Sequence, residues 1–442
     1  MKNIFRKKEP VERWIIDPIG RFVNNSTTSG IVLFSAAFMA IVLSNSPFAD
    51  TFHGFWETKL SIGFADWQLS KDLHHWINDG LMAVFFFVVG LELKREIISG
   101  ELSNPRNAIL PVAAAIGGML VPAAIYLIFN PSGEVHSGWG IPMATDIAFA
   151  LGILYLLGDR VPVSLKIFLT VLAIADDLGA VLVIAFFYTS DINMISLLTG
   201  AGFMVVLIGA NLIGVRNTLF YGIIGIGGLW LAFLMSGVHA TIAAVLAAFT
   251  IPANVKYNEL AFERKLNTLM TLFHNADPNN SPTVTLEQLH ILEKIRYISK
   301  HAITPLQQLE HSMHPLVAFI IMPVFALANA GIVLSAESLA HLTSTVTMGV
   351  FFGLLIGKFI GVVGSVTLLT RLRIASLPPG FTLRHLMGTG LLAGIGFTMS
   401  LFISELAFKN KLYVEEAKMG ILLASLVAGI LGYFVLSSAS KK

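Results

Sequence analysis

Phe168-Leu-Thr-Val-Leu-Ala-Ile-Ala-Asp-Asp-Leu-Gly-Ala-Val-Leu-Val-Ile-Ala-Phe186 is an apolar run with two adjacent acids, Asp176 and Asp177, near its middle. The apolar segment extends from about residue 163 to 188, which is long enough to cross a hydrocarbon layer of ~30 Å. At ~1.5 Å per helical residue the acids lie roughly 20 Å from its start, close to mid-membrane. A carboxylate there costs at least about 2–3 kcal/mol unless it faces water or a partner. We therefore interpret the pair as functional, with a structural role for one acid as the alternative.

The composition indicates a polytopic membrane protein. The chain is 55% hydrophobic and only 13% charged, whereas about a quarter of the residues of a soluble domain are charged. The absence of cysteine excludes disulfides and thiolate metal sites. We expect no cofactor and no nucleic-acid partner. No cleavable signal peptide is visible before the first apolar run.

Apolar runs of the length of membrane spans recur along the chain and predict an all-α protein with about twelve transmembrane helices. The predicted spans are 29–46, 73–93, 108–129, 137–158, 163–188, 194–214, 217–236, 238–252, 315–334, 346–370, 386–408 and 414–437. With the N-terminus inside, 23 of the 29 lysines and arginines fall on the inner side, five fall outside and Lys358 lies in a span. This bias predicts a multi-pass protein of the bacterial inner (plasma) membrane with both termini in the cytoplasm.

Three regions follow from these spans. Residues 1–28 are predicted to be a cytoplasmic N-terminal segment, 29–437 the transmembrane domain, and 438–442 a cytoplasmic tail. Within the domain, an outer hairpin is expected at about 47–72, because residues 59–69 alternate between apolar and polar. A lone two-stranded hairpin is marginally stable, so we expect it to pack on something, such as a second protomer.

A long inner loop is predicted at about 253–312. It contains two amphipathic helical patterns, near 257–273 and 283–301, separated by the turn-like residues 275–282. The loop contains no span and need not form a separate domain.

Two spans are predicted to be interrupted. In Gly140-Ile-Pro-Met-Ala-Thr-Asp-Ile-Ala-Phe149, Pro142 weakens the helix ahead of Thr145 and Asp146. Gly394-Ile-Gly-Phe-Thr-Met-Ser400 is a second weakened, polar stretch. Interrupted spans in corresponding halves are typical of transporters with inverted repeats. The alternative is that the glycines only allow helices to pack closely.

Lys358 lies near the centre of its span. A lysine at this depth must pair with a carboxylate, face water or lose its proton. The acids available at mid-depth are Asp146, Asp176 and Asp177. A purely structural salt bridge is the alternative to a role in transport.

Two clusters of titratable residues lie at predicted inner ends of spans. Glu92, Arg95 and Glu96 have helical i, i+3 and i+4 spacing, which is equally typical of a surface ion-pair cluster. Glu310, His311 and His314 open the ninth span, and their imidazoles titrate near neutral pH. We interpret Glu92, Glu310, His311 and His314 as candidate pH sensors, with polar residues at a helix entrance as the alternative.

Six motifs of the chain are considered together: Ala144-Thr-Asp146, Ala173-Ile-Ala-Asp-Asp-Leu-Gly179, Val89-Gly-Leu-Glu-Leu-Lys-Arg-Glu96, Gly357-Lys-Phe359, Leu309-Glu-His-Ser-Met-His-Pro315 and Gly394-Ile-Gly-Phe-Thr-Met-Ser400. In combination they resemble the NhaA-type bacterial Na+/H+ antiporters, a similarity that extends from about residue 12 to the C-terminus. The 253–312 loop is longer than this resemblance leads us to expect.

The resemblance implies that spans 3–5 and 10–12 form inverted repeats whose broken helices cross beside the aspartates. It implies that Asp146 offsets the positive helix N-termini at the crossing and that Lys358 offsets the negative C-termini. Asp177 then corresponds to the Na+ ligand and Asp176 to the second titrating acid, with Thr145 nearby. The residues Glu92, Glu310, His311 and His314 correspond to a cluster tied to the pH response.

The chemistry of the residues agrees with this family. Na+ prefers oxygen ligands, which carboxylates, hydroxyls and freed carbonyls supply. Two adjacent carboxylates cannot easily both stay ionised in a low dielectric, so Na+ and H+ compete for them. We therefore expect that the protein is not an enzyme but an electrogenic, pH-regulated antiporter for sodium and pH homeostasis. Its expected substrates are Na+, Li+ and H+, and its expected partners are membrane lipids and a second protomer.

Three rival functions remain open from the residues alone. A channel needs a continuous lined pore, whereas these acids cluster at one depth. A transporter of organic solutes needs an apolar and aromatic pocket beside the ion site. An intramembrane aspartyl protease needs two facing carboxylates, whereas adjacent helical residues diverge.

Overall fold

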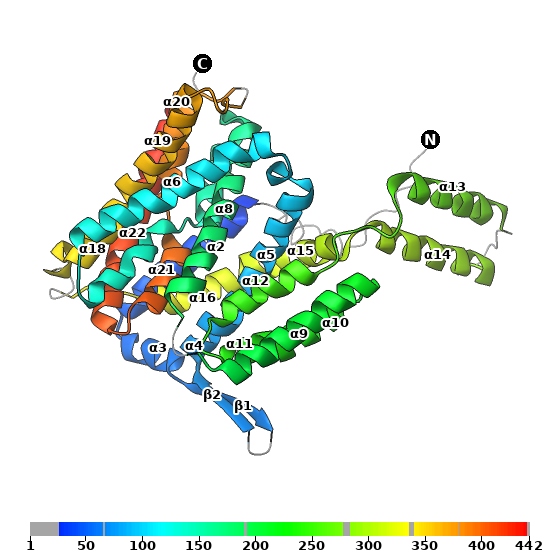
Figure 1. Ribbon diagram of the computed structural model, residues 1–442, viewed down its shortest axis with the longest axis horizontal. Helices are drawn as coiled ribbons and strands as arrows, with labels where there is room; N and C mark the ends of the chain where they lie inside the picture. Colours follow the sequence, from blue (N-terminus) through cyan, green and yellow to red (C-terminus); the bar gives the residue numbers. More distant parts are fainter. Residues whose placement is uncertain are drawn as a thin grey trace.

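The molecule is a bundle of helices with one small hairpin of strands (Figure 1). This computed structural model describes residues 26–64, 67–189, 192–276, 283–335, 340–378 and 380–439. Most of the predicted N-terminal segment 1–28 and of the predicted tail 438–442 lies outside these residues. The predicted all-α class is confirmed, because the described strands are limited to a single pair.

The helices follow the order of the predicted spans. Those with α-helical geometry are α2 (Ser26–Ser44), α3 (Ala49–Trp56), α4 (Leu73–His75), α5 (Met82–Ser99), α6 (Pro105–Phe129), α7 (Ile147–Leu156), α8 (Val163–Phe187), α9 (Met194–Ile213), α10 (Thr218–Ile224), α11 (Leu231–Leu234), α12 (Ala240–Thr250), α13 (Glu259–Asn275), α14 (Leu286–Ala302), α15 (Pro305–Leu316), α16 (Met322–Asn329), α18 (Thr345–Phe352), α19 (Lys358–Arg371), α20 (Leu383–Ala393), α21 (Phe397–Ala407) and α22 (Lys411–Ala439).

Four π-helical turns lie between these helices, and the sequence patterns did not predict them. They are η2 (Trp76–Leu81), η6 (Gly225–Trp230), η7 (Val317–Ile321) and η9 (Gly353–Gly357). Such turns occur frequently at functional sites. The turn η9 ends directly before Lys358, at the start of α19.

By length and composition, seven helices of the described chain can cross a membrane, or nine if each of two bent pairs is one span. The chain is therefore a multi-pass membrane protein. The remaining predicted spans, 73–93, 217–236 and 238–252, correspond to helices that are shorter or more charged. The count of twelve stays a prediction.

Both predicted interruptions are present. The first span begins as a 3₁₀ helix, η4 (Glu134–Met143), which ends just after Pro142, and α7 starts only at Ile147. The second consists of α20 and α21, which are bent by 41° about residues 394–396. The 3₁₀ geometry of η4 is a departure from the α-helix that the apolar pattern predicts.

The predicted hairpin is present, and its position on the outer side of the membrane stays a prediction. Strand β1 (Lys59–Phe64) pairs antiparallel with β2 (Trp67–Asp72), and the hairpin projects from the helical body in Figure 1. Asp72 ends β2 and caps α4, because its carboxylate accepts the backbone N–H of His75 at 2.7 Å. Partial burial alone would raise the pKa of Asp72, but the hydrogen bonds from His75 outweigh it and hold that pKa below its usual value.

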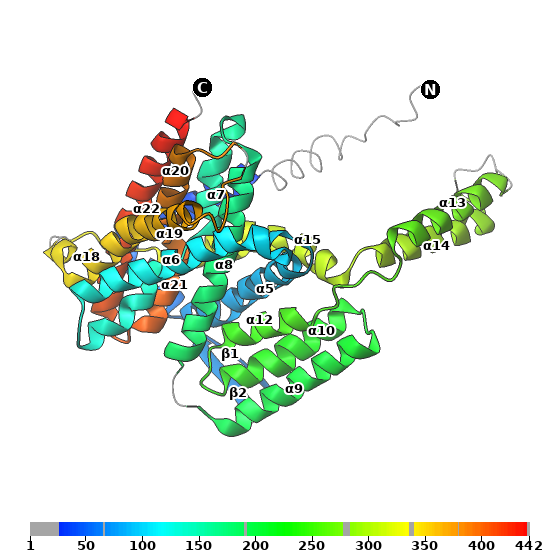
Figure 2. The same cartoon turned by 45° about the horizontal axis from the view of Figure 1, so that its top comes forward.

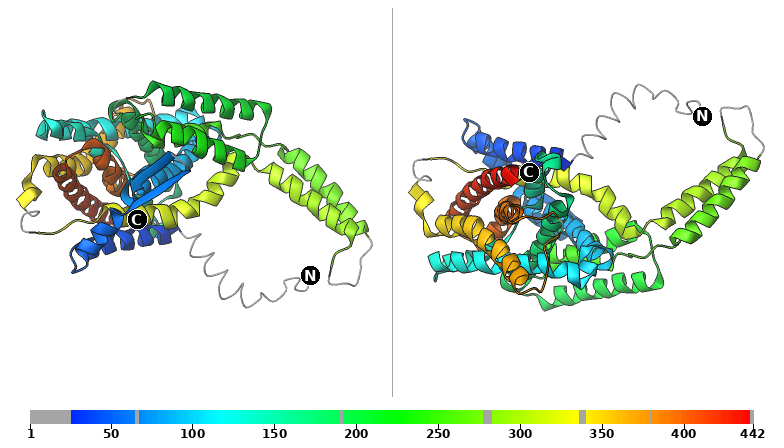
Figure 3. Two further views of the ribbon diagram at one scale, coloured as in Figure 1. Left: turned by 90° about the horizontal axis from the view of Figure 1, so that it is seen from below. Right: turned by 90° about the horizontal axis from the view of Figure 1, so that it is seen from above.

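The predicted inner loop forms an antiparallel helix pair, α13 and α14, that extends away from the bundle (Figures 2 and 3). Both predicted amphipathic helices are therefore confirmed. The loop ends earlier than predicted, because α15 begins at Pro305. Thr304 and Gln307 form a reciprocal capping box that starts this helix.

Helices α6 and α19 pack together at glycines. A Cβ atom added to Gly361 would lie 2.2 Å from the carbonyl oxygen of Gly117, which is backbone and cannot turn away. Gly117 is equally crowded, because its Cβ would lie 2.5 Å from the carbonyl oxygen of Gly361. These glycines bring the helix that begins with Lys358 against α6.

We expect Gly361→Ala to destabilise the protein by about 1–3 kcal/mol, because the added methyl group forces two helix backbones apart. Thermal unfolding of the purified protein in detergent measures the change. Gly364→Ala is the matched control, since a Cβ there meets nothing within 4 Å on the same helix. Equal melting temperatures for the two variants would contradict the close-packing role of Gly361.

Candidate functional site

The two aspartates lie in the middle of α8 and are almost completely buried, with exposures of 1% for Asp176 and 0% for Asp177. Neighbouring helical positions differ by ~100° in direction, so the two side chains meet different surroundings. Asp176 is held by partners from other helices, whereas Asp177 is not. This difference gives the two acids different chemistry.

The interrupted spans meet through Asp146. Its Oδ1 accepts the backbone N–H of Phe149 at 3.0 Å and so caps α7. Its Oδ2 accepts both the backbone N–H of Thr398, at 3.0 Å, and the Thr398 hydroxyl at the start of α21. One carboxylate therefore serves the first turns of two half-helices, whose N-termini carry partial positive charge.

A backbone hydrogen bond joins the two interruptions directly. The N–H of Asp146 donates to the carbonyl oxygen of Ile395 at 2.6 Å. Ser400, in the first turn of α21, donates its hydroxyl to the carbonyl oxygen of Ile141 at 2.8 Å. The freed backbone groups of each interrupted span are thus satisfied by the other span.

Asp176 lies between Lys358 and Thr145. The buried ammonium group of Lys358 forms an ion pair with Asp176 Oδ2. Thr145 Oγ1 lies 2.7 Å from the same oxygen and 2.9 Å from the carbonyl oxygen of Ala393, at the end of α20. The hydroxyl can donate to only one of them at a time. Lys358 is thus paired with Asp176. That Lys358 also offsets the negative charge of the helix C-termini stays a prediction.

Asp177 is buried, and within the described chain neither of its carboxylate oxygens has a hydrogen-bond partner. It lines a cavity of about 330 Å³ together with Asp146, Glu92, His311 and His314. The cavity therefore connects the unpaired aspartate with three of the four candidate pH-sensing residues. The sequence alone could not show this, because Asp177 and the histidines lie on different helices.

The fourth candidate, Glu310, is joined to the helix of Glu92. Arg95 on α5 donates its Nε to Glu310 Oε1 and Oε2, at 2.9 and 3.1 Å, and pairs with Glu96 at 2.9 Å. Arg95 and Glu96 thus form the ion pair of the alternative interpretation, but Glu96 is buried and the pair is not at the surface. Glu92 instead faces the cavity. The ion pair between Arg95 and Glu310 therefore joins the two predicted clusters beside the cavity.

Three groups at the site were missed by sequence reasoning. They are the Ala393 carbonyl, the Thr398 backbone N–H and the π-helical turn η9. The Gly394-Ile-Gly396 interruption signals that backbone groups are freed nearby, but it cannot identify their partners. His239 places its Nε2 2.7 Å from the carbonyl oxygen of Tyr188.

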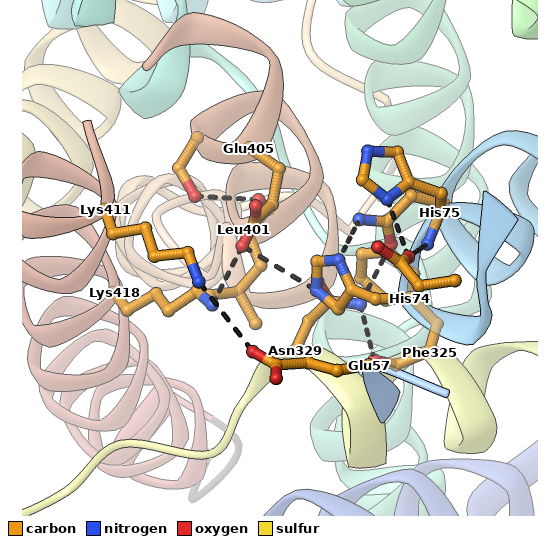
Figure 4. A network of polar contacts seen from close by, with 12 residues as sticks. Glu57, His74, His75, Phe325, Asn329, Leu401, Glu405, Lys411 and Lys418 are labelled. Carbon is orange, nitrogen blue, oxygen red and sulfur yellow. Dashed lines mark hydrogen bonds and ion pairs between the residues drawn. The ribbon is translucent and has the colours of Figure 1, made fainter. Parts of the chain in front are cut away.

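A separate polar network lies at the other end of α21 (Figure 4). Glu405 pairs with Lys418 of α22 at 2.8 Å and lies 4.0 Å from the His74 ring. Asn329 donates to Asn78 Oδ1 at 3.1 Å in the same region. These contacts tie the far end of the second interrupted span to its neighbours.

Comparison with known proteins agrees with this architecture. The model of a family described as Na+/H+ antiporter 1 matches residues 20–436. The chain belongs to this antiporter family. It is a transporter and not an enzyme, so the protease alternative is wrong, and the predicted family resemblance is confirmed.

Curated members of the family resemble the chain over almost its whole length. The Na(+)/H(+) antiporter NhaA of Oleidesulfovibrio alaskensis is 51% identical and the alignment covers 97% of this chain and 95% of that protein. The NhaA protein of Acidithiobacillus ferrooxidans is 50% identical, with 97% and 99% covered. The solved structure of the sodium proton antiporter MjNhaP1 of Methanocaldococcus jannaschii aligns with a TM-score of 0.49 at 10% identity. The alignment covers 97% of the present chain and 98% of MjNhaP1.

We expect Lys358→Gln and Asp176→Asn each to destabilise the antiporter by about 3–5 kcal/mol, because each leaves one buried charge unpaired. The double variant should recover most of this loss, since no orphan charge remains. Thermal unfolding measures all three. Lys411→Gln is the control, because its pair with Glu57 is largely exposed to water and should contribute about 1 kcal/mol or less. A double variant as unstable as the worse single variant would contradict the pairing.

Proposed function

We propose that the chain exchanges cytoplasmic Na+ or Li+ for external H+, with Asp177 as the cation ligand. The observation that carries the proposal is that Asp177 is buried without a hydrogen-bond partner in the described chain, yet lines a cavity with titratable residues. A buried carboxylate of this kind is stable only when it binds a proton or a cation. Na+ and H+ therefore exclude one another at the same oxygens.

Oxygen atoms of the right kind gather at the adjacent Asp176. Asp176, the Thr145 hydroxyl and the Ala393 carbonyl lie close together, and all are hard ligands that suit a small alkali cation. In our proposal, Na+ bound to Asp177 draws Asp176 into its shell and breaks the pair between Asp176 and Lys358. The competing view is that Lys358 is mainly structural and stabilises the crossing of the interrupted spans.

The same rearrangement makes the exchange electrogenic. When Na+ arrives, Asp177 gives up its proton, and Lys358, now without its partner, gives up a second one. Two positive charges then leave the site for each one that enters, so the membrane potential drives Na+ export. Access to the site alternates between the two sides of the membrane, which here is the bacterial inner membrane with both termini cytoplasmic.

Glu92, Glu310, His311 and His314 serve in this proposal as the pH sensor of the antiporter. Their support is that three of them line the cavity with Asp177 and that Arg95 joins Glu310 to α5. Protonation near neutral pH would change the field along the path to Asp177. The outer hairpin, whose strands β1 and β2 pair only with each other, is proposed to mediate a homodimer.

Asp177→Asn should abolish transport, because the amide has nearly the same size but cannot exchange a proton for Na+. The assay is dequenching of a pH-sensitive dye in proteoliposomes with an imposed proton gradient. Na+ or Li+ should release the gradient in the parent and K+ should not. Asp50→Asn, on exposed α3, is the control and should retain activity. Substantial Na+-dependent dequenching by Asp177→Asn would refute the proposal.

Glu310→Gln should shift the pH at which antiport begins by on the order of one unit, the size of effect that a neighbouring charge has on a titrating group. Removing the negative charge leaves Arg95 without this partner and changes the electric field at the neighbouring cavity, so the pH profile of activation should move. Maximal activity should be retained. The pH profile of dequenching measures the shift, with Glu259→Gln on exposed α13 as the control. Superimposable profiles would remove Glu310 from the sensor.

A further inference from the structure

A second cavity, of about 800 Å³, lies where α19 ends and α6 begins, remote in sequence from the aspartates of α8. Arg106 and Ile109 of α6 line it on one side, and Arg373, Ile374 and Leu377 line it on the other. Both helices are long and apolar enough to span the membrane. The cavity therefore lies at the level where spans end and lipid headgroups begin.

Two positive charges meet at this cavity without a negative one. Arg106 and Arg373 are both exposed, and neither forms an ion pair with any residue in the described part of the chain. The described residues that line the cavity include no acid. Glu101, which precedes α6, is engaged elsewhere, because its carboxylate accepts the side-chain amide of Asn107 at 2.9 Å. An anion would therefore be attracted to this cavity.

The backbone at Arg373 is unusual. Its φ of 57° is the only positive φ of a non-glycine residue in the described ranges. The turn ends α19 through hydrogen bonds from Arg373 N–H to Thr370 and from Ile374 N–H to Leu369, at 3.2 and 3.0 Å. Glycine is the usual residue at such a helix end. An arginine here carries a conformational cost that glycine would avoid.

Apart from the hydroxyls of Thr370 and Ser376, the rest of the lining is apolar. Ile109 and Ile374 are 37% and 52% exposed. An exposed apolar surface therefore lies in the same cavity as the two guanidinium groups. Arginine binds phosphate oxygens through paired N–H groups, and basic pockets between transmembrane helices hold lipid headgroups. We propose that this cavity binds the phosphate group of an anionic phospholipid, with the start of an acyl chain lying against Ile109 and Ile374.

The first test is the thermal stability of the purified, delipidated protein with added phosphatidylglycerol or phosphatidylcholine. Phosphatidylglycerol should raise the melting temperature more than phosphatidylcholine does. Arg106→Gln and Arg373→Gln should each remove most of this difference, whereas Arg264→Gln, on exposed α13, should retain it. Equal effects of the two lipids on the parent, or an unchanged difference in both cavity variants, would overturn the proposal.

Two further experiments separate lipid from free phosphate and the charge of Arg373 from its backbone conformation. Phosphate alone at the same concentration should have no effect, and stabilisation by it would show a site for free phosphate instead of lipid. Arg373→Gly keeps the left-handed turn and removes the charge. It should therefore raise the melting temperature of the lipid-free protein and yet lose the response to phosphatidylglycerol. A glycine variant that keeps the full lipid response would refute a role for the guanidinium, even if Arg106→Gln fails to fold.

Discussion

The carboxylate of Asp146 is the contact on which the centre of this antiporter depends. A helix interrupted inside a membrane exposes backbone N–H and C=O groups that lipid cannot satisfy. Asp146 accepts from the first turns of both α7 and α21, and its own N–H donates to Ile395. Each interruption therefore satisfies polar groups of the other. The same arrangement places the Thr145 hydroxyl between Asp176 and the Ala393 carbonyl.

The four buried charges of this region have different partners. Asp146 is matched by two helix N-termini, and Asp176 by the ammonium group of Lys358. Asp177 has neither kind of partner in the described chain. A buried charge without a partner is the most costly state of the three. The cost of an unpaired buried charge therefore falls on Asp177, which lines the cavity.

Local patterns in the sequence predicted the local features of the structure. Pro142 and the glycines of 394–396 predicted the interruptions, alternation predicted β1 and β2, and amphipathic periodicity predicted α13 and α14. What the sequence could not give were contacts between distant residues, such as Asp146 with Thr398, 252 positions apart, and Arg95 with Glu310, 215 apart. The π-helical turns were also missed, because their extra residue per turn arises from packing and not from a residue pattern.

The strengths of the contacts at the two ends of α21 indicate which of them can change during transport. At the crossing, its first turn is fixed by buried hydrogen bonds to Asp146, and breaking these would leave a buried charge exposed to apolar surroundings. Just beyond the far end, Lys411 at the start of α22 pairs with Glu57 at 3.8 Å, and both side chains are largely exposed to water; such pairs contribute about 1 kcal/mol or less. An 11-residue helix is a rigid rod of ~16 Å. Alternating access is therefore less costly if the two interrupted spans move as one unit and the exposed pair beyond the far end of α21 breaks.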